Sequence, residues 1–376
     1  MTALALDAEA PTGTPRPPLK LVPSTPAPEA SGLTSEQVEE LGRRLDAIRE
    51  RIVADRGERD AAYINDVIRK QRWLEIGGRA LLFAGVLPPA WLAGTAMLSV
   101  AKILENMELG HNVMHGQWDW MRDPKIHSTT WEWDTMSTSE MWKHSHNYLH
   151  HTYTNVVGKD RDVGYGILRM SDEQRWNPYY LGNPLWNALL AIFFQWGVAL
   201  HDLEVEKVLA GEKDRRTLWG QVKAVGGKIV KQFTKDYVVF PALAGPFLLP
   251  VLAGNLTANL VRNLWSHAII FCGHFPNGAL QFDESQIEGE TRGQWYVRQM
   301  LGSANLDGGT LFHLLSGNLS FQIEHHLFPD LPSNRYAEIA PEIRELCAEY
   351  GLEYTTGPLG KQYGQVLCKI ARLALP

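Results

Sequence analysis

The sequence predicts an all-helical membrane protein: two transmembrane helical hairpins, about four spans in total, joined to a helical cytoplasmic cap that holds a site for two metal ions. Two apolar blocks, residues 74–104 and 237–272, predict the hairpins. Apolar residues at helical spacing before and after these blocks predict the helices of the cap. Three groups of histidines, also at helical spacing, predict the metal site.

The composition agrees with this class and excludes others. The 376 residues carry a net charge of −6, which gives no reason to expect a nucleic-acid partner. The mean hydropathy of −0.21 is low for a membrane protein because polar ends average out the apolar blocks. The start of the chain lacks the basic and apolar regions of a signal peptide. Three widely spaced cysteines predict a reducing compartment without a disulfide framework: Cys272, Cys347 and Cys368.

The chain begins with a tail, residues 1–32, that is rich in Pro, Ala and Thr, so we expect it to be disordered and residues 33–376 to form the domain. Thr34 and Gln37 form a capping-box pattern that predicts a helix from Thr34 onward. A second helix is predicted over Ala61–Trp73. This amphipathic, basic stretch could lie on the cytoplasmic face of a bilayer or pack on the domain. Its apolar stripe consists of Val38, Leu41, Leu45, Ile48 and Ile52.

The first apolar block, residues 74–104, has Pro88–Pro89 at its centre. A full span needs ~20 residues, so the block is too short for two of them. A proline pair inside a helix would kink or break it. We therefore predict a short, tilted helical hairpin that turns at Leu87–Trp91. A single long, kinked span is the alternative, and it would move the first histidine group to the other side of the membrane.

The second half of the membrane region contains three segments of different character. Residues 184–200 are apolar but short, and we expect them to lie in the membrane interface without crossing. Residues 204–236 form a charged, lysine-rich loop, and residues 237–272 form a second hairpin broken at Gly254–Asn255. The three histidine groups can meet only if the chain crosses an even number of times between them. The lysine-rich loop then lies on their side, which predicts an integral protein of the cell (inner) membrane with its site on the cytoplasmic side.

Two further helices are predicted after the last histidine group. Ser333 is a plausible N-cap for a helix over Asn334–Tyr350, and Gly351 is the candidate C-cap. A final helix is predicted over Gln362–Leu375, with basic residues in its polar face. The alternative of a soluble ferritin-like bundle is disfavoured, since no Glu-x-x-His pair occurs in a helical repeat.

The three histidine groups are the stretches MELGHNVMHGQ (107–117), HSHNYLHH (144–151) and QIEHHLFP (322–329). Residues three or four apart share one helix face, and neutral imidazole is the commonest metal ligand. Eight or nine such ligands are too many for one tetrahedral ion, so the count predicts two metals. The residues concerned are His111, His115, His146, His150, His151, Gln322, His325 and His326.

These patterns, H-x3-H, H-x3-HH and Q-x2-HH, resemble the three histidine boxes of the membrane fatty-acid desaturase family. The stretches ENMELGHNVMHGQWDW, KDRDVGYG, FCGHFP and GQWYVRQMLGSAN are similar to the actinobacterial acyl-CoA desaturases of the stearoyl-CoA Δ9 type. The resemblance extends from about Leu33 to the C-terminus. It implies two Fe ions as cofactor and O2 as co-substrate.

The resemblance also implies a ligand set. The seven box histidines, His111, His115, His146, His150, His151, His325 and His326, match the family's ligands. Gln322 stands where many relatives have a histidine, so it is either a direct or water-mediated ligand or a hydrogen-bond partner. The family adds one histidine between its last span and the third box. His274, in CGHFP, is the favoured candidate; His267, which follows Asn263 in an N-x3-H spacing, is the alternative.

Several neighbouring residues are candidates for supporting roles. Four carboxylates could orient the ligands or could simply be solvated or surface charges: Glu105, Glu108, Asp160 and Asp162. Three tryptophans could lie at the mouth of a substrate channel or in the membrane interface: Trp118, Trp131 and Trp133. Of the remaining histidines, His127, His201 and His313 are predicted to make structural hydrogen bonds, and His144 is predicted to face away from His146 on its helix.

The function implied by the resemblance is O2-dependent, di-iron desaturation of a long-chain fatty acyl substrate, as the CoA thioester and at Δ9. Side chains alone offer no oxidant for an unactivated C–H bond, so a metal must supply it. No ferredoxin, flavin, haem or cytochrome b5 motif occurs, which predicts a separate reductase or ferredoxin as electron donor. Two alternatives remain: a fatty acyl or alkane hydroxylase with the same boxes, and a non-enzymatic membrane metal-binding protein.

Overall fold

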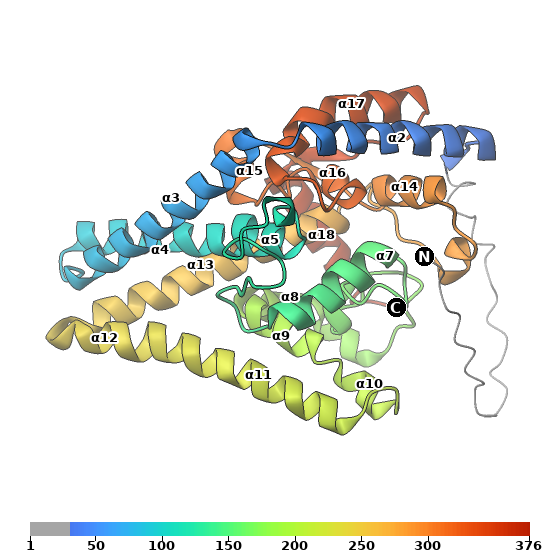
Figure 1. Ribbon diagram of the computed structural model, residues 1–376. Helices are drawn as coiled ribbons and strands as arrows, with labels where there is room; N and C mark the ends of the chain where they lie inside the picture. The colour runs from blue at the N-terminus through green and yellow to red at the C-terminus, as the bar shows by residue number, and fades with distance from the viewer. Residues whose placement is uncertain (1–30) are drawn as a thin grey trace.

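The computed structural model describes residues 31–376 and shows an elongated, mostly helical molecule (Figure 1). Two long helical hairpins taper to one end, and a broader group of helices forms a cap at the other. All but the last two residues of the predicted disordered tail, 1–32, lie outside the described residues. Short 3-10 turns occur in the connections, at Asp119–Met121, Gly164–Gly166, Pro178–Gly182, Glu284–Ile287 and Ser333–Arg335.

Helix α2 (Ser35–Asp55) begins at the predicted capping box. The Gln37 amide N–H donates to Thr34 Oγ1 (3.2 Å), and the Thr34 N–H donates to Gln37 Oε1 (2.9 Å). Its apolar stripe is buried against the cap, in contact with α14 (Arg292–Leu301) and α17 (Tyr336–Glu349). The prediction of this helix is confirmed, and its apolar face packs on the domain.

The first hairpin consists of α3 (Glu58–Phe83) and α4 (Pro88–Leu104), which pack along each other. The predicted helix over Ala61–Trp73 is therefore the beginning of a longer one. The chain turns at residues 84–87, a few residues before the predicted Leu87–Trp91. Pro88 and Pro89 occupy the first turn of α4, where a missing N–H is harmless. The hairpin is confirmed and the single kinked span is excluded.

The second hairpin differs from its prediction. Its first arm is α11 (Arg215–Phe233), a π-helical segment (Thr234–Val239) and α12 (Phe240–Leu243); its second arm is α13 (Leu248–His274). The predicted lysine-rich loop, 204–236, is wrong, because most of it is the helical outer arm. The chain turns at Gly245–Phe247 in a 3-10 turn.

The predicted break at Gly254–Asn255 is also wrong, since α13 runs through it unbroken. Gly254 lets α13 approach the first hairpin: a Cβ atom there would lie 2.5 Å from Cδ2 of Leu82. The Asn255 side-chain amide donates to the carbonyl of Asp236 (2.5 Å). Both residues thus allow helices to pack closely. In the sequence, a Gly-Asn pair with this role looks the same as a Gly-Asn pair that forms a turn.

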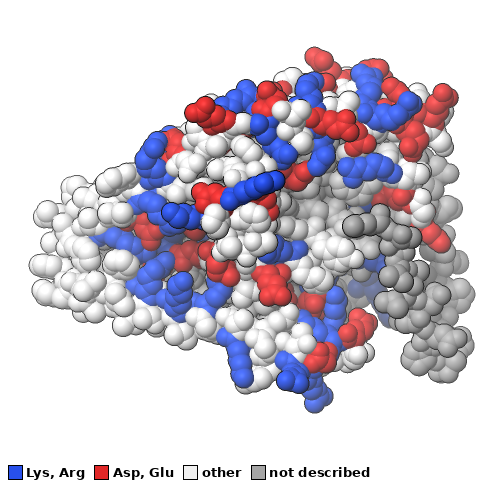
Figure 2. Space-filling view, viewed as in Figure 1, with Lys and Arg blue, Asp and Glu red and all other residues white. Residues whose placement is uncertain are grey.

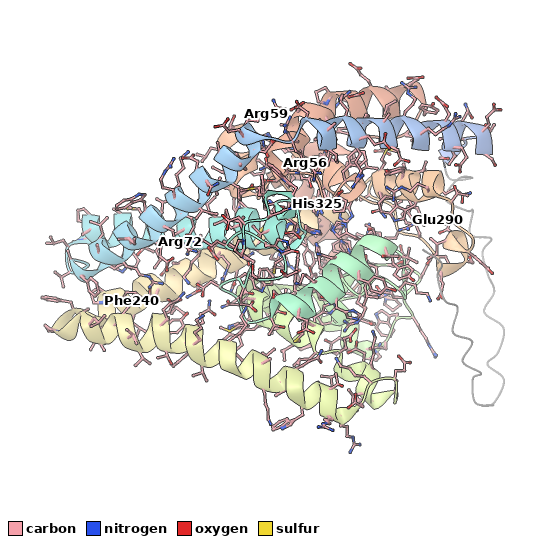
Figure 3. The ribbon with its side chains drawn as sticks, viewed as in Figure 1. Arg56, Arg59, Arg72, Phe240, Glu290 and His325 are labelled. Atoms are coloured by element: carbon pink, nitrogen blue, oxygen red, sulfur yellow. The ribbon has the colours of Figure 1, made fainter. Side chains whose placement is uncertain are left out.

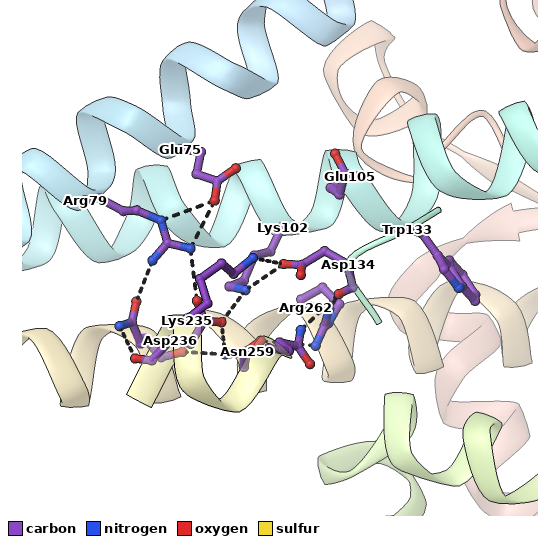
Figure 4. Close-up of polar contacts among 12 residues, drawn as sticks. Glu75, Arg79, Lys102, Glu105, Trp133, Asp134, Lys235, Asp236, Asn259 and Arg262 are labelled. Carbon is purple, nitrogen blue, oxygen red and sulfur yellow. Dashed lines mark hydrogen bonds and ion pairs between the residues drawn. The ribbon is translucent and has the colours of Figure 1, made fainter. Parts of the chain in front are cut away.

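A charge network fills the space between the hairpins (Figure 4). Its charged members are Glu75, Arg79, Lys102, Asp134, Lys235 and Asp236. The buried carboxylate of Asp236 accepts from Arg79 (3.0 Å) and Lys102 (2.8 Å). Lys235 donates to Asp134 (2.8 Å). The network therefore ties both hairpins together by ion pairs that are complete within the protein.

The apolar segment at 184–200 forms two short helices, α8 (Asn183–Ile192) and α9 (Phe194–Asp202), followed by α10 (Val205–Leu209). The chain bends by 99° between them. Within residues 31–376, no single helix is both long enough and apolar enough to cross a membrane, whereas this bent pair together meets the length and composition criteria. The fold is thus mostly helical as predicted, and the number of spans stays a prediction.

The cap contains the remaining elements. The predicted helix over Asn334–Tyr350 is α17, which starts two residues later; the Ser333 hydroxyl donates to Glu108 (2.6 Å) instead of capping it. Gly351 follows with φ +65°, as a C-terminal glycine should. The final helix, α18 (Leu359–Arg372), begins three residues before its predicted start. The shorter elements of the cap are α15 (Thr310–Leu315), α16 (Gln322–Leu327) and the parallel strands β1 (Asn305–Asp307) and β2 (Thr356–Pro358).

Candidate metal centre

The first two histidine boxes lie in widened helical turns. α4 continues into a π-helical segment (Glu105–His111) and then α5 (Asn112–Met114), with His115 as the next residue. The second box lies in α6 (Ser139–Trp142), a π-helical segment (Lys143–His150) and α7 (His151–Tyr153). Such segments are rare and occur mostly at functional sites. In these segments, residues four positions apart in sequence still lie next to each other, since the ring centroids of His111 and His115 are 4.6 Å apart.

The structure brings all three boxes and His274 together as one histidine cluster. Figure 3 shows His325, from α16, in the interior of the molecule. Its ring lies 4.8 Å from that of His115, although the two are far apart in sequence. The rings of His151 and His326 stack at 4.4 Å, and that of His274 lies 4.7 Å from His150. The cluster consists of His111, His115, His146, His150, His151, His274, His325 and His326.

Within this cluster the ligand atoms form two neighbouring groups that could each hold a metal ion. Within each group, the candidate ligand atoms lie within 4.8 Å of one another. One group contains His111, His115, His146 and His325; the other contains His150, His274 and His326. His151 joins His325 and His326 between them. This arrangement suits two metals, as the ligand count predicts.

Many of these nitrogens are buried without a hydrogen-bond partner among the described residues. They are Nε2 of His115, His150, His325 and His326, both ring nitrogens of His151 and Nδ1 of His274. Leaving one polar atom buried and unpaired costs about 1–3 kcal/mol, so a whole group of them in one place is unstable without a ligand. Metal ions satisfy imidazole lone pairs, and the donor set therefore fits the iron pair that the resemblance implies.

The opposite ring nitrogens are held by hydrogen bonds. Asp160 lies 2.9 Å from Nδ1 of His150, and Asp162 lies 3.4 Å from Nδ1 of His146. An acceptor at Nδ1 keeps the proton there and leaves Nε2 free for a metal. Both carboxylates thus contact ligand candidates, as one of the two sequence interpretations proposes.

Glu105 and Glu108 do not contact any imidazole of the cluster in this way. Glu108 accepts hydrogen bonds from Tyr63 (2.9 Å), Asn318 (3.0 Å) and Ser333 (2.6 Å). A Glu105 carboxylate oxygen lies 3.8 Å from Arg72. They are buried charges of the helix packing, so their suggested role in holding ligand tautomers is not supported.

Four partners of the histidines escaped the sequence analysis. The Asn112 side chain lies 3.1 Å from Nδ1 of His111, and the Tyr336 hydroxyl lies 3.2 Å from Nδ1 of His325. Nδ1 of His326 contacts both Gln299 Oε1 (3.1 Å) and the Thr154 hydroxyl (3.2 Å). Asn112 directly follows a box histidine, and Gln299 lies in the stretch GQWYVRQMLGSAN, which are weak signals. Thr154 and Tyr336 lie outside these stretches, and nothing in the sequence marks them.

Burial sets the protonation state of the cluster. It lowers the pKa of six histidines well below 6.5, and their mutual repulsion lowers it further: His111, His115, His151, His274, His325 and His326. Burial also acts to lower the pKa of His150, but Asp160 outweighs it and the net shift is upward. The neutral imidazole is the form that binds metals.

The structure separates the two candidates for the additional histidine. His274 lies in the cluster, and its Nε2 is 3.0 Å from the side-chain amide nitrogen of Gln322. Gln322 therefore reaches the edge of the cluster, with its Oε1 buried and unpartnered among the described residues. His267 instead contacts Asn187 (3.1 Å), and Asn263 donates to the carbonyl of Ile192 (2.8 Å). Neither His267 nor Asn263 is brought to the cluster.

The other four histidines lie outside the two groups, in agreement with their predicted structural roles. His313 contacts the Ser320 hydroxyl (2.7 Å), and the His127 ring contacts the Thr129 hydroxyl (2.9 Å). Of these four, His201 is linked to the cluster through one residue: its Nε2 lies 3.1 Å from Asp162, which also contacts His146. His144 is exposed on the outer face of the second box.

A narrow central cavity of about 60 Å³ lies beside the cluster. Histidines and Gln322 line one part of it, and apolar side chains line another: Phe194, Val198, Ile270, Phe275 and Leu319. Of the three tryptophans considered for a channel mouth, Trp133 lines the cavity. Trp118 is fully buried in a separate core, and Trp131 packs at the edge of that core.

A second, basic cavity adjoins the central one. It is lined by Arg72, Lys102, Lys228, Lys231 and Lys235 together with the acidic residues Glu75, Glu105, Glu132 and Asp134. Trp133 and Thr135 line both cavities. The two cavities therefore meet at residues 133–135.

Comparison with known proteins gives a consistent result. The model of the family "Fatty acid desaturase" matches residues 86–358. An NADPH-dependent stearoyl-CoA 9-desaturase of Mycobacterium tuberculosis is 52% identical over 348 residues, covering 92% of this chain and 82% of the relative. An sn-1 linoleoyl-lipid 6-desaturase of Synechocystis is 28% identical over 302 residues, covering 77% of this chain and 82% of the relative. The geometry of the histidine cluster and these matches together place the chain in the fatty acid desaturase family.

Proposed function

We propose that this protein is an O2-dependent, di-iron desaturase that introduces a double bond at Δ9 into a long-chain fatty acyl-CoA. The observation that carries the proposal is the convergence of the histidine cluster, with its unpartnered nitrogens, beside a narrow cavity that is partly apolar. When bound, two irons together with O2 and two electrons supply the oxidising power to remove two hydrogens from the chain. The 52% identical relative, a stearoyl-CoA 9-desaturase by name, supports the substrate and the position.

The residues of the chain would bind the irons and the acyl chain, orient the imidazoles and shield the site from water. The two groups of histidines hold the irons, and Gln322 adds a direct or water-mediated contact. Asp160, Asp162 and Gln299 fix the orientation of the imidazoles behind them. The apolar side of the central cavity holds the acyl chain against the cluster and excludes water. Because the site is buried in the cap, competing reactions with solvent are suppressed.

The basic cavity supports a CoA thioester over a free acid. Lys231 and Arg72, which lie outside the charge network, are natural partners for phosphate groups. It adjoins the central cavity at residues 133–135, so a head group in one cavity can carry a chain that extends into the other.

The proposed location is the cell (inner) membrane, with the site on the cytoplasmic side. The tapering end of the molecule carries few charged side chains, whereas Lys, Arg, Asp and Glu cover the rest (Figure 2). Large apolar side chains are exposed near the hairpin turns, which suits insertion in lipid: Val86, Leu87, Leu92, Leu243, Leu248 and Leu249. Arg215 and Arg216 begin α11, at the end of this helix that is far from its hairpin turn, which supports a cytoplasmic cap under the positive-inside rule.

The electron donor is proposed to be a separate protein, a reductase or a ferredoxin. The sequence contains no motif for a flavin, haem or iron–sulfur cluster. The name of the mycobacterial relative includes NADPH, which suits a donor chain that begins with a nicotinamide cofactor.

The test is expression with a reductase partner and incubation of the membranes with stearoyl-CoA. We expect an O2-dependent product that has lost two hydrogens, with the double bond at Δ9 when the methyl esters are analysed by mass spectrometry. A product that has gained one oxygen would instead identify a hydroxylase. Stable iron binding without turnover would identify a metal-binding protein.

A further inference from the structure

The junction between the two cavities, residues 133–135, is held in place from both sides. Arg262, which is buried in α13, donates from Nη1 to the carbonyl of Asp134 (3.1 Å) (Figure 4). From the other side, Lys228 donates to the carbonyl of Trp133 (2.9 Å). The Trp133 indole N–H donates to the carbonyl of Ser137 (2.8 Å). The junction is therefore a fixed part of the wall between the two cavities.

Besides the ligand candidates His150, His274 and Gln322, two polar side chains of the central cavity contain a buried atom without a partner among the described residues. Thr135 at the junction is 4% exposed, and its Oγ1 makes no hydrogen bond. Gln195, from α9, is 7% exposed, and its Oε1 is also buried and unpaired.

Other polar groups that line this cavity are paired. Asn106 donates to Ser266 (3.0 Å), and Ser145 donates to Asp202 (2.6 Å). Asn263 is paired with the carbonyl of Ile192. Buried polar groups in native proteins are nearly always satisfied, so two exceptions in addition to the ligand candidates indicate a missing ligand.

We propose that Thr135 and Gln195 bind the carbonyl oxygen of the acyl thioester and thereby determine which carbon lies at the histidine cluster. This inference rests on the proposed function. The Thr135 hydroxyl can donate a hydrogen bond, and the Gln195 side-chain amide can donate through Nε2, because no hydrogen bond in the described part of the chain fixes the orientation of this amide. A carbonyl oxygen can accept two such bonds. The three hydrogen bonds of the nearby Arg262 guanidinium go to neutral oxygens, of Asp134, Asn259 and Asn263, so its charge also favours a carbonyl dipole.

The position of the two side chains matches the chemistry of the substrate. In an acyl-CoA, the thioester carbonyl lies where the polar head group ends and the apolar chain begins. Thr135 lies where the basic cavity ends and the central cavity begins. With the carbonyl fixed there, the distance along the chain to the cluster selects one carbon pair for the reaction.

The test measures the position of the double bond in products made from stearoyl-CoA. We expect a single position for the natural protein and a mixture for Thr135→Val and Gln195→Leu. Displaced products should rise to about a tenth or more of the total, because losing one hydrogen bond shifts a binding equilibrium by severalfold. Thr135→Ser, which keeps the hydroxyl, should restore the single position.

A matched control is Thr95→Val. Thr95 in α4 is equally buried and its Oγ1 is also unpartnered among the described residues, but it lies against Gly254 and lines neither cavity. This variant should give a single double-bond position. A loss of folding would lower the amount of product in any variant, but it would not move the double bond.

A second measurement needs no variant. Palmitoyl-CoA and stearoyl-CoA should give the same position counted from the carbonyl, whereas recognition of the methyl end would shift it by two carbons. A single position in both cavity variants, or a shift with chain length, would overturn the carbonyl assignment and leave Thr135 and Gln195 as partners of bound water. Absence of any desaturated product from the natural protein would instead refute the proposed function.

Discussion

The histidine cluster and the charge network are two buried polar regions that share the same helices. α4 contributes Lys102 to the network and leads into the first histidine box, and α13 packs beside the network and ends at His274. In the network, Asp236 has two cations within 3.0 Å and Asp134 pairs with Lys235. In the cluster, by contrast, many imidazole nitrogens are buried without a partner among the described residues.

This difference separates a structural region from a reactive one. Removing charges from water is unfavourable unless the ions satisfy one another, and the network meets that condition by itself. The cluster does not, so it is complete only with a bound ligand. Burial and charge alone would not distinguish the two regions, whereas the count of unpaired atoms does.

Loss of one cluster histidine should abolish function. His326→Ala removes a ligand candidate that faces both His150 and His274. We expect desaturation to fall more than ~100-fold, the upper range for losing only a hydrogen-bond partner of a ligand, and iron content to fall with it. Product yield and iron per protein measure this. His144→Ala, at an exposed histidine two residues before His146, is the matched control and should change neither.

Loss of one network carboxylate should affect stability instead. Asp236→Ala removes the buried carboxylate that Arg79 and Lys102 share, and leaves Arg79 with Glu75 and Lys102 with Asp134 alone. Such a change costs about 3–5 kcal/mol, which thermal or urea unfolding in detergent would reveal. Iron per folded molecule should stay constant. Asp172→Ala breaks an exposed pair with Arg372 and should cost about 0–1 kcal/mol. Equal effects of the two variants would contradict the structural role of the network.

An intermediate effect on metal affinity is expected when a residue that holds a ligand histidine in place is changed. Asp160→Asn weakens the hydrogen bond to Nδ1 of His150 while preserving the shape of the side chain. We expect metal affinity to fall about 10–100-fold, as measured by competition with a chelator. Asp66→Asn, at an exposed carboxylate of α3, should leave the affinity unchanged. Unchanged affinity in both would mean that Asp160 does not orient the ring.

The two regions should respond to acid in different pH windows. The pKa values of the six histidines are lowered below 6.5 by burial, so the unfolded chain binds more protons and stability is lost as the pH falls through 6.5. For Asp236, burial acts to raise the pKa, but Lys102, Lys235 and Arg79 outweigh it and hold it at about 2. Its contribution is present above 3.8 and is lost only as the pH falls from 3.8 toward 2.

Unfolding of iron-free protein from about pH 7.5 to about pH 2 measures both windows. Burial raises the pKa of Glu105 and Glu108 to about 7, so their contribution is lost as the pH rises through 7 and partly offsets that of the histidines. We expect stability to decrease from pH 6.5 downward, and added metal to suppress the decrease. A constant stability down to about pH 4 would contradict the neutral state of the cluster.

The comparison also explains what could be predicted from the sequence. The cluster was found because its residues lie at fixed local spacings, and only the nearby partners Asp160 and Asp162 could be proposed. Gln299 and Tyr336 reach the cluster through tertiary packing, which no local spacing encodes.

The hairpins show the same limit. Pro88–Pro89 marks the first turn within a few residues, because proline favours the start of a helix. Gly254–Asn255 resembles a turn in sequence but serves contacts with Leu82 and Asp236. The lysines of α11 resemble a loop in sequence because their contacts, such as that of Lys228 with the Trp133 carbonyl, are made with residues that are distant in sequence.

The π-helical segments at the first two boxes have one more consequence, which concerns chain length. Each widened turn accommodates an additional residue just before or within the ligands. Deleting a single residue there would rotate everything downstream by about 100° and turn the imidazoles away from one another. Natural variants of this chain should therefore tolerate substitutions within Glu105–His111 and Lys143–His150 at positions other than the ligand histidines, but insertions and deletions hardly at all.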